Sequence, residues 1–271
     1  KGINTEKLFF GTVNAKKLKK EYGNQDLLIA NNVLAHVPNI LDFCEGVKII
    51  LSPAGIATFE FPHFYNLINK LQFDTIYHEH FSYLTVHSIC KLFPKFDLEI
   101  FDIKKISTHG GSLRVFVKHK NNKKHKVKNS VNKLLHLEKS SKIFTDKKFL
   151  KFNNKIKLIK KTIINLLIEL KLKRKKIIAY GAPAKGNTFL NYCMLDSGII
   201  KFTVDKNPSK IRKFLPGSKI PILHTKSIKA EKPDYIIILP WNLSKEIIKQ
   251  VRKTYSAPKF ITAIPKVAIH K

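Results

Sequence analysis

Methionine and cysteine are scarce in this chain of 271 residues. Met194 is the only methionine, and the sequence starts at Lys1 rather than at an initiator methionine. We therefore expect either that processing removed an N-terminal stretch or that the sequence is a fragment of a longer protein. The cysteines, Cys44, Cys90 and Cys193, are isolated and form no CxxC pair. They predict neither a disulfide framework nor a thiolate zinc site, and they fit a reducing cytoplasm.

Long hydrophobic runs are also absent from the sequence. The longest apolar stretch, around Thr162 to Leu172, is interrupted by Asn165, Glu169 and Lys171, so it is too short and too polar to cross a bilayer. Nothing in the sequence resembles a signal peptide. With 44% hydrophobic residues, the chain supplies enough apolar surface for two cores. We expect a soluble, globular, cytoplasmic protein with two domains and no membrane partner.

Arginine is rare although the formal net charge is +32. Lysine supplies most of the positive charge, and the arginines are Arg114, Arg174, Arg212 and Arg252. Such a charge suggests a polyanionic partner, because lysines that neutralise phosphates release counterions. Recognition of bases and phosphates tends to use the forked guanidinium of arginine, however, and the excess of lysine, isoleucine and asparagine resembles a drift in composition. This favours solvated lysine-rich faces over a nucleic-acid site, and an anionic small substrate is compatible with both.

The order of the hydrophobic segments predicts an α/β fold. Residues 26–34 and 55–63 are apolar runs typical of buried strands, and 37–53 between them has helical spacing, so together they predict a parallel strand, helix, strand unit. Residues 98–106 and 112–119 alternate and predict a β-hairpin that closes the sheet at its edge.

A long amphipathic pattern separates this region from a second α/β pattern. Apolar residues recur at steps of three and four from Phe149 to Leu170, which predicts a helix that packs on a domain face. We expect a first Rossmann-like sheet over residues 1–119, a connecting helical segment over 120–176 and a second, smaller Rossmann-like sheet over 177–271.

The segment FDTIYHEHFSYLT, residues 73–85, places several titratable side chains side by side. Tyr77, Glu79 and His80 belong to it, and His87 follows shortly after. Polar groups buried without partners cost free energy, so these side chains either lie on the surface or line a site. The spacing is not HExxH, which disfavours a metal site. A histidine beside a glutamate and a tyrosine suits proton transfer, and a solvated polar loop is the alternative.

Further candidates lie where predicted strands end. His36, preceded by the pair Asn31 and Asn32, follows the first strand, on the side where open α/β sheets bind ligands. His109 precedes two glycines in the predicted hairpin. For each of these two histidines, a capping or surface role is the alternative.

The turn GAPAKGNT, from Gly181 to Thr188, follows a predicted strand and has glycines five residues apart, as a phosphate-binding loop does. It does not match the Walker pattern, because Lys185 precedes the second glycine. A helix N-terminus with free amides, close to Lys185 and Thr188, is able to hold a diphosphate, and a purely structural turn is the alternative.

Six stretches resemble the sugar C-methyltransferases, in the same order and over nearly the whole chain. They are ANNVLAHVPNILDF, FDTIYHEHFSYLT, STHGGSLRVFV, YGAPAKGNTFLNY, DKNPSK and PGSKIPI. Enzymes of this family use S-adenosylmethionine to methylate a carbon of a nucleotide-linked ketodeoxysugar. The resemblance implies an N-terminal zinc-binding domain, a central class I methyltransferase domain and a C-terminal Rossmann-like domain, with the sugar nucleotide bound between the latter two.

The resemblance also implies roles for individual residues. Residues 1–119 would be the C-terminal part of the methyltransferase domain, and 177–271 the domain that binds the sugar nucleotide. A carbon next to a ketone becomes a nucleophile only after it loses a proton, and His80 would take that proton while Glu79 orients its imidazole. Tyr77 and His36 are candidates to hold the keto oxygen.

The sequence departs from the family at the cofactor site. The glycine-rich loop and the acidic strand end that hold S-adenosylmethionine are missing, and so is the zinc-binding domain, in which alone we expect zinc. What is left of the cofactor site is a predicted strand at 7–10, ending at Phe10, and the strand end at Ala30, Asn31 and Asn32. We therefore expect this chain alone to bind the cofactor poorly and not to be an independent methyltransferase.

Two other functions stay open at this stage. A nucleotide-sugar-binding module without catalysis would bind the diphosphate sugar but no S-adenosylmethionine. A nucleic-acid-binding protein would show an affinity that falls steeply with salt. The predicted substrate-binding residues are His109, Lys185, Asn187, Thr188, Asp205 and Lys210.

Overall fold

The computed structural model describes residues 2–271, which divide into two compact units. The first unit comprises the described residues up to Asn66 together with His78–Ile143, and the second comprises Leu67–Tyr77 together with Phe144–Lys271. Each unit has a sheet and a hydrophobic core of its own, which confirms the α/β fold class. No helix within residues 2–271 combines the length and the hydrophobicity that a bilayer crossing requires.

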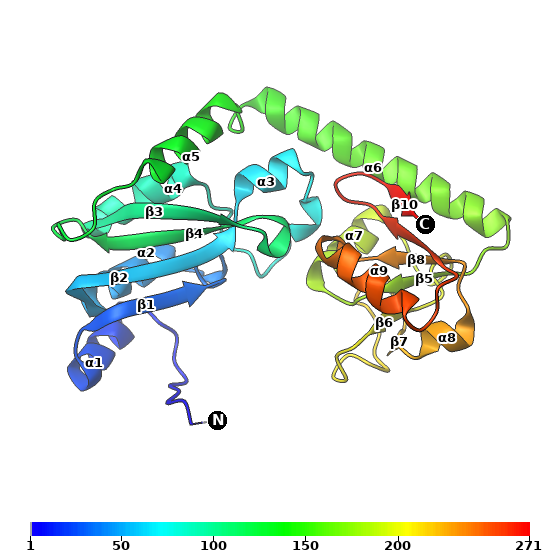
Figure 1. Ribbon diagram of the computed structural model, residues 1–271, viewed down its shortest axis with the longest axis horizontal. Coiled ribbons are helices and arrows are strands. Elements are labelled where there is room, and N and C mark those ends of the chain that lie inside the picture. The colour runs from blue at the N-terminus through cyan, green and yellow to red at the C-terminus, as the bar shows by residue number, and fades with distance from the viewer. Residues whose placement is uncertain (1) are drawn as a thin grey trace. The chain divides into compact units, whose positions relative to one another are not determined.

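The first unit is built on a sheet of four strands, counted over the described residues. Its elements are α1 (Thr12–Tyr22), β1 (Gln25–Asn31), η1 (Leu34–His36), α2 (Ile40–Ile50), β2 (Leu51–Pro62), α3 (Phe64–Asn69, which crosses into the second unit), α4 (Val86–Leu92), η3 (Phe93–Phe96), β3 (Leu98–Ile106), η4 (Thr108–Gly110), β4 (Ser112–His119) and α5 (Asn129–Ser140). The strand order is β1-β2-β4-β3, which Figure 1 shows from the bottom to the top of this unit. β1 pairs with β2 in parallel, and β4 is antiparallel to both of its neighbours, so the predicted parallel unit and the hairpin are confirmed.

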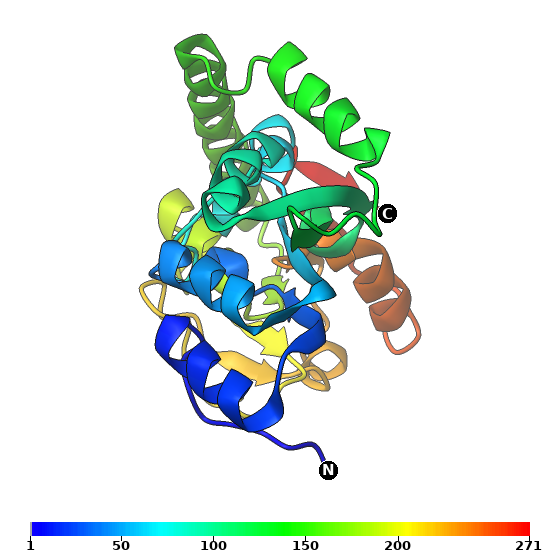
Figure 2. The same ribbon diagram turned by 90° about the vertical axis from the view of Figure 1, so that its left-hand side faces the viewer.

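Local signals explain why α2 forms and where it lies. The side chain of Asn39 caps its first turn and accepts a hydrogen bond from the backbone N–H of Asp42 at 3.1 Å. Phe43, Cys44 and Val47 then recur at helical spacing and are buried in the core of the unit. α1 packs beside α2, as the blue helices in Figure 2 show. The first helix turn of α2 is thereby fixed directly after β1 and η1.

The strand predicted at residues 7–10 is wrong. The chain there has no regular structure, and it leads into α1, which the sequence pattern did not indicate. A strand needs a neighbour for its backbone groups, and among residues 2–271 β1, at the edge of this sheet, pairs with β2 alone. β1 leaves Leu27 54% and Ile29 63% exposed. Residues 7–10 are not added to this edge.

The second unit is built on a sheet of six strands within the described residues, against four in the first, so the prediction of a smaller second sheet is wrong. Its elements are η2 (Phe73–Thr75), α6 (Asp146–Leu172), β5 (Ile177–Tyr180), α7 (Ala184–Cys193), β6 (Thr203–Asp205), β7 (Ile222–His224), α8 (Ser227–Glu231), β8 (Tyr235–Ile238), η5 (Trp241–Leu243), α9 (Ser244–Arg252), β9 (Lys259–Thr262) and β10 (Ala268–His270). The order is β10-β9-β8-β5-β6-β7, and all pairs are parallel except β9 with β10. β10 lies antiparallel to β9 and forms one edge of the sheet.

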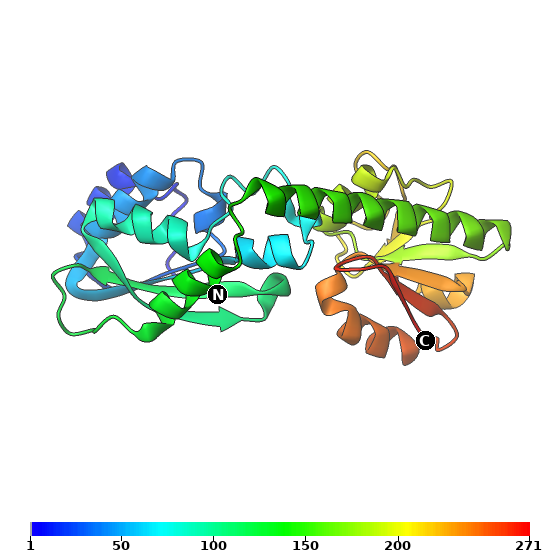
Figure 3. The ribbon, with the colours of Figure 1, turned by 90° about the horizontal axis from the view of Figure 1, so that it is seen from above.

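Helices cover both faces of this second sheet. One core cluster joins α6 and α7 to the strands and the other joins α8 and α9 to them, and Figure 3 shows α6 and α9 on opposite sides of the strands. The segment 120–176 was expected to be a connection. In the structure it is divided, because α5 buries Val131 and Leu134 in the core of the first unit, whereas α6 buries Ile163 and Leu167 in that of the second.

Candidate active site

A pocket of about 610 Å³ lies in the first unit where η1 follows β1 and α2 begins. Its lining is mostly apolar and consists of Leu8, Phe9, Phe10, Val33, His36, Val37, Pro38, Asn39, Asp42 and Phe43. The ring of Phe10 meets that of Phe43 edge-on, with 5.3 Å between their centroids. Two residues predicted for different roles, Phe10 for the cofactor and His36 for catalysis, therefore line one pocket.

The other predicted cofactor residues lie at the carboxyl end of β1 but are not among the lining residues of this pocket. Ala30 is buried in the core, and Asn31 is exposed. Asn32 is exposed and adopts a left-handed backbone conformation with φ of 56°, which asparagine tolerates better than most residues. Its N–H donates to the carbonyl oxygen of Glu60 at 2.8 Å, which holds the strand end against β2.

His36 is held against the Tyr-His-Glu-His segment. Its Nδ1 lies 2.7 Å from the carbonyl oxygen of Glu79, and because a carbonyl only accepts, Nδ1–H is the donor. The rings of His36 and His80 lie 4.7 Å apart between centroids. The N–H groups of Phe81 and Ser82 donate to the carbonyl oxygen of Ala35, at 2.9 and 3.2 Å. The structure thus brings together His36 and His80, which are 44 positions apart in the sequence.

The remaining residues of the segment differ in exposure. Glu79 contributes its carbonyl to His36, while its side chain is exposed, like that of His78. His80 is half-buried, and its ring meets that of Tyr83 edge-on at 6.0 Å. Tyr77 is half-buried and belongs to the second unit. That Glu79 orients His80 and that Tyr77 holds the keto oxygen stay predictions.

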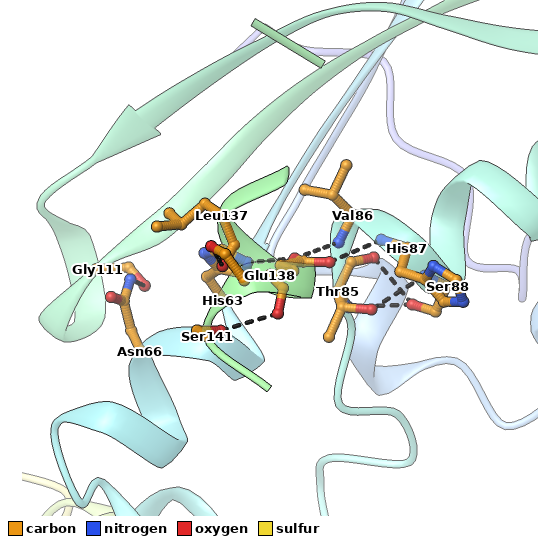
Figure 4. Close-up of polar contacts among 11 residues, drawn as sticks. His63, Asn66, Thr85, Val86, His87, Ser88, Gly111, Leu137, Glu138 and Ser141 are labelled. Atoms are coloured by element: carbon orange, nitrogen blue, oxygen red, sulfur yellow. Dashed lines mark hydrogen bonds and ion pairs between the residues drawn. The ribbon is translucent and has the colours of Figure 1, made fainter. Parts of the chain in front are cut away.

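A buried carboxylate, Glu138 of α5, anchors the chain that follows this segment (Figure 4). Glu138 is 1% exposed, and its Oε1 accepts hydrogen bonds from His63 Nε2 at 2.6 Å and from the backbone N–H of Val86 at 2.7 Å. Its Oε2 accepts from the N–H of His87 at 2.9 Å. One side chain therefore joins the residue after β2 to the first turn of α4.

Sequence reasoning missed Glu138, although a signal for it exists. Val131, Leu134 and Glu138 recur at steps of three and four, so a carboxylate occupies the apolar face of α5. A charged residue at such a position is buried and needs partners. Residues 118–128, which precede α5, are rich in lysine and show no apolar period, so the pattern that predicts a buried face is limited to a few residues of α5.

In the second unit, two predicted substrate-binding residues hold the turn after β5. Asp205 Oδ2 accepts from the N–H of Ala182 at 2.7 Å, and Lys210 Nζ donates to the carbonyl oxygen of Ala182 at 2.8 Å. Gly181 has φ of 91°, and a Cβ there would lie 2.7 Å from Cδ of Pro240. Asp205 and Lys210 thus fix the turn in this structure, and contact with substrate stays a prediction for both.

The predicted phosphate-binding residues begin α7. Lys185 is half-buried, donates from Nζ to Asn242 Oδ1 at 2.8 Å and lies 5.0 Å from the centroid of the Trp241 ring. Asn187 Oδ1 is buried and makes no hydrogen bond within the described residues. Thr188 Oγ1 lies 3.4 Å from the carbonyl oxygen of Ala184, one helical turn earlier. Lys185 therefore does not extend freely into solvent but packs on an indole ring.

A second carboxylate that sequence reasoning missed lies beside Lys185. Asp74 of η2 is 1% exposed, and its Oδ2 accepts from Trp241 Nε1 at 2.7 Å. Burial raises the pKa of Asp74 from the ordinary 3.8 to about 6, while the bond from Trp241 and the charge of Lys185 act in the opposite direction. Burial lowers the pKa of Lys185, and the charge of Asp74 opposes that shift. Desolvation thus outweighs the mutual attraction for both groups.

This shift predicts a pH dependence of stability. Because the native pKa of Asp74 lies above 3.8, the native state binds more protons than the unfolded state between pH 3.8 and about pH 6. The contribution of Asp74 to the free energy of unfolding is therefore fully present below pH 3.8 and falls as the pH rises to about 6, by up to about 3 kcal/mol. Asp74→Asn keeps an acceptor for Trp241 but does not titrate. Denaturant unfolding at about pH 4 and about pH 7 should show the parent losing stability relative to this variant, and parallel profiles would contradict the prediction.

His109, predicted to bind substrate, lies in η4 of the first unit. Its side chain is exposed and its backbone is left-handed, with φ of 54°. The turn places it at the hairpin end near Gly111, and substrate contact stays a prediction. Within residues 2–271, no three side chains of His, Cys, Asp or Glu gather closely enough to hold a metal ion.

Comparison with known proteins shows which family this chain resembles. A model described as the C-methyltransferase C-terminal domain matches residues 107–265. C-methyltransferase NovU of Streptomyces niveus is 32% identical over 267 residues, which make up 98% of this chain and 63% of NovU. The chain thus spans less than two thirds of that relative's length.

Solved S-adenosylmethionine-dependent methyltransferases match smaller parts of the chain. The enzyme from Anabaena variabilis is 14% identical and covers 41% of this chain and 55% of its own, with a TM-score of 0.31. The enzyme from Clostridium acetobutylicum is 12% identical, and the match covers 35% of this chain and 58% of that enzyme, with a TM-score of 0.28. The family model matches more than half of the residues of this chain, and the chain therefore belongs to the C-methyltransferase family.

Proposed function

We propose that the chain is part of a C-methyltransferase that transfers a methyl group from S-adenosylmethionine to the carbon next to the ketone of a nucleotide-linked deoxysugar. Family membership and the similarity to the C-methyltransferase NovU over 98% of the chain support the reaction type, and the sugar substrate is what the resemblance of the six sequence stretches implies. The observation that carries the proposal is the juxtaposition of His36 and His80, whose rings lie 4.7 Å apart, with His36 in the lining of a pocket that follows a strand end. Open α/β sheets bind their ligands at this place.

The apolar walls of the pocket, Phe10, Val33, Val37 and Phe43, fit an aromatic base such as the adenine of S-adenosylmethionine. Asn39 and Asp42 also line the pocket, but Asn39 caps α2 and Asp42 Oδ1 accepts from the backbone N–H of Thr12 at 3.0 Å. The bound cofactor supplies an electrophilic methyl group. The residues of this chain supply the base and the charge around the substrate.

In this proposal His80 removes the proton next to the ketone, and His36 stabilises the oxygen of the resulting enolate. Since Nδ1–H of His36 donates to Glu79, a neutral His36 has only an acceptor at Nε2. It therefore donates to the enolate oxygen only as an imidazolium, whose charge is of the right sign to stabilise an enolate. This assigns opposite protonation states to the two adjacent rings, with His80 neutral and His36 charged.

Methyl incorporation tests the proposal. The full-length gene product is incubated with S-adenosylmethionine labelled in its methyl group and with a panel of nucleotide-linked 4-ketodeoxysugars. We expect the label on a carbon of the sugar, so that it stays with the sugar when the nucleotide is removed by hydrolysis. Binding of the sugar nucleotide without transfer to any member of the panel would favour the alternative, a nucleotide-sugar-binding module without catalysis. Transfer to an oxygen or a nitrogen of the sugar would contradict the base chemistry.

A further inference from the structure

The segment Leu67–Tyr77 belongs to the second unit, although it lies in the sequence between α3 and the Tyr-His-Glu-His segment of the first. It packs on α7. Phe73 is buried in the core of the second unit, with its ring centroid 6.3 Å from that of Phe189 and 5.1 Å from that of Tyr192. The structure therefore fixes η2 to the same helix whose first turn carries Lys185.

Asp74 and Lys185 contact the same indole from different elements. Asp74 Oδ2 accepts from Nε1 of Trp241, and Lys185 Nζ lies 5.0 Å from the centroid of its ring. The other oxygen, Asp74 Oδ1, is buried and has no hydrogen-bond partner within the part of the chain described. A buried carboxylate needs a compensating charge, and Lys185 is the cation whose charge acts on it.

Lys185 is also one of the residues that the sequence predicts to bind the substrate, at a turn able to hold the diphosphate of the proposed sugar nucleotide. An ammonium group has three donors, and a diphosphate is a stronger partner for it than the amide oxygen of Asn242. A diphosphate at the turn adds negative charge beside Asp74. It also attracts the ammonium group of Lys185, whose charge otherwise compensates that of Asp74. Asp74 and the diphosphate therefore compete for Lys185.

We propose that Asp74 is a positioning residue that competes with the diphosphate for Lys185, so that ligand binding loosens η2, six residues before His80. The inference rests on the proposed nucleotide-sugar site and adds a regulation to it. Linkage is reciprocal, so a ligand that weakens the hold on η2 binds more tightly once that hold is removed. If Asp74 had a merely structural role, its removal would instead disorder the site and weaken binding of the ligand.

The test uses the 271-residue chain and free dTDP, UDP and inorganic pyrophosphate as probes, with affinities measured by calorimetry. Asp74→Asn should bind the diphosphate that the parent binds about fivefold more tightly or better. Hydrogen exchange should show the ligand accelerating the amides of Thr75 and Ile76, which bond to Gln72 and Phe73, in the parent but not in the variant. Glu231→Gln removes an exposed carboxylate of the same unit, paired with Lys201, and serves as the matched control with unchanged affinity.

Equal or weaker binding by a folded Asp74→Asn would overturn the competition. If the parent binds none of the diphosphates, the proposed nucleotide-sugar site fails, and the link between Asp74 and Lys185 is judged on the unliganded chain. Lys185→Gln removes the compensating charge and should by itself accelerate exchange at Thr75 and Ile76. Unchanged exchange there would overturn the link, and this measurement also decides the matter if Asp74→Asn does not fold.

Discussion

Replacing His80 by asparagine in the full-length gene product should lower kcat for methyl transfer by about 10²- to 10⁴-fold, because a positioned general base contributes about that much. Asparagine keeps a polar side chain of similar size but cannot take a proton at neutral pH. The measurement is the initial rate of label transfer from S-adenosylmethionine to the sugar at saturating substrate. Exchange of the sugar α-proton with deuterated solvent should fall in parallel, because that step precedes methyl transfer.

His78 provides the matched control for this experiment. It has the same side chain, lies two residues away and is exposed, whereas the ring of His80 lies against that of His36. His78→Asn should change kcat by less than about threefold. If His78→Asn abolishes transfer while His80→Asn does not, the base has been assigned to the wrong histidine of the segment.

Truncation of Glu138 to alanine should lower the free energy of unfolding by about 3–5 kcal/mol. The change leaves the ring of His63 and the backbone N–H of Val86 buried without this acceptor, and it also removes the acceptor of the half-buried N–H of His87. Glu138→Gln keeps one acceptor oxygen and should cost less, about 1–3 kcal/mol. Denaturant unfolding measures both values, and exchange at Val86 and His87 locates the loss.

Glu169 of α6 is the control, because it is also a helical glutamate with a side-chain partner, Lys173, but its side chain is 59% exposed. Glu169→Ala should change the free energy of unfolding by less than about 0.5 kcal/mol. Similar values for the two alanine variants would mean that the bonds of Glu138 contribute no more than a surface pair.

The elements predicted most accurately are those whose pattern is local and long. The alternating hairpin and the helix from Phe149 to Leu170 carry their periodicity within a few residues, and the structure has β3, β4 and α6 at these places. The strand at 7–10 failed because strand formation depends on a neighbour elsewhere in the chain, which a local pattern does not contain. β10 was missed for a related reason, since three residues at a sheet edge give too short a pattern.

The site shows the same division between local and distant information. The Tyr-His-Glu-His segment and the turn at Lys185 stand out as clusters of polar residues within one stretch. Asp74 and Glu138 do not, because each is a single carboxylate whose partners lie far along the chain, 167 residues away for Trp241 and 75 for His63. The approach of His36 to His80 was implied only by resemblance to a family, since spacing alone does not bring two such positions together.

The assignment of Leu67–Tyr77 to the second unit bears on how genes of this family can recombine. A segment encoding only residues 144–271 would lack η2, and so would leave Phe189 and Tyr192 without Phe73 and Trp241 without its acceptor. A single crossover between two such genes, at any point between the codons of Asp74 and Lys185, would take these two residues from different parents. We therefore expect chimaeras that transfer the second unit to fold best when residues 67–77 come from the same parent.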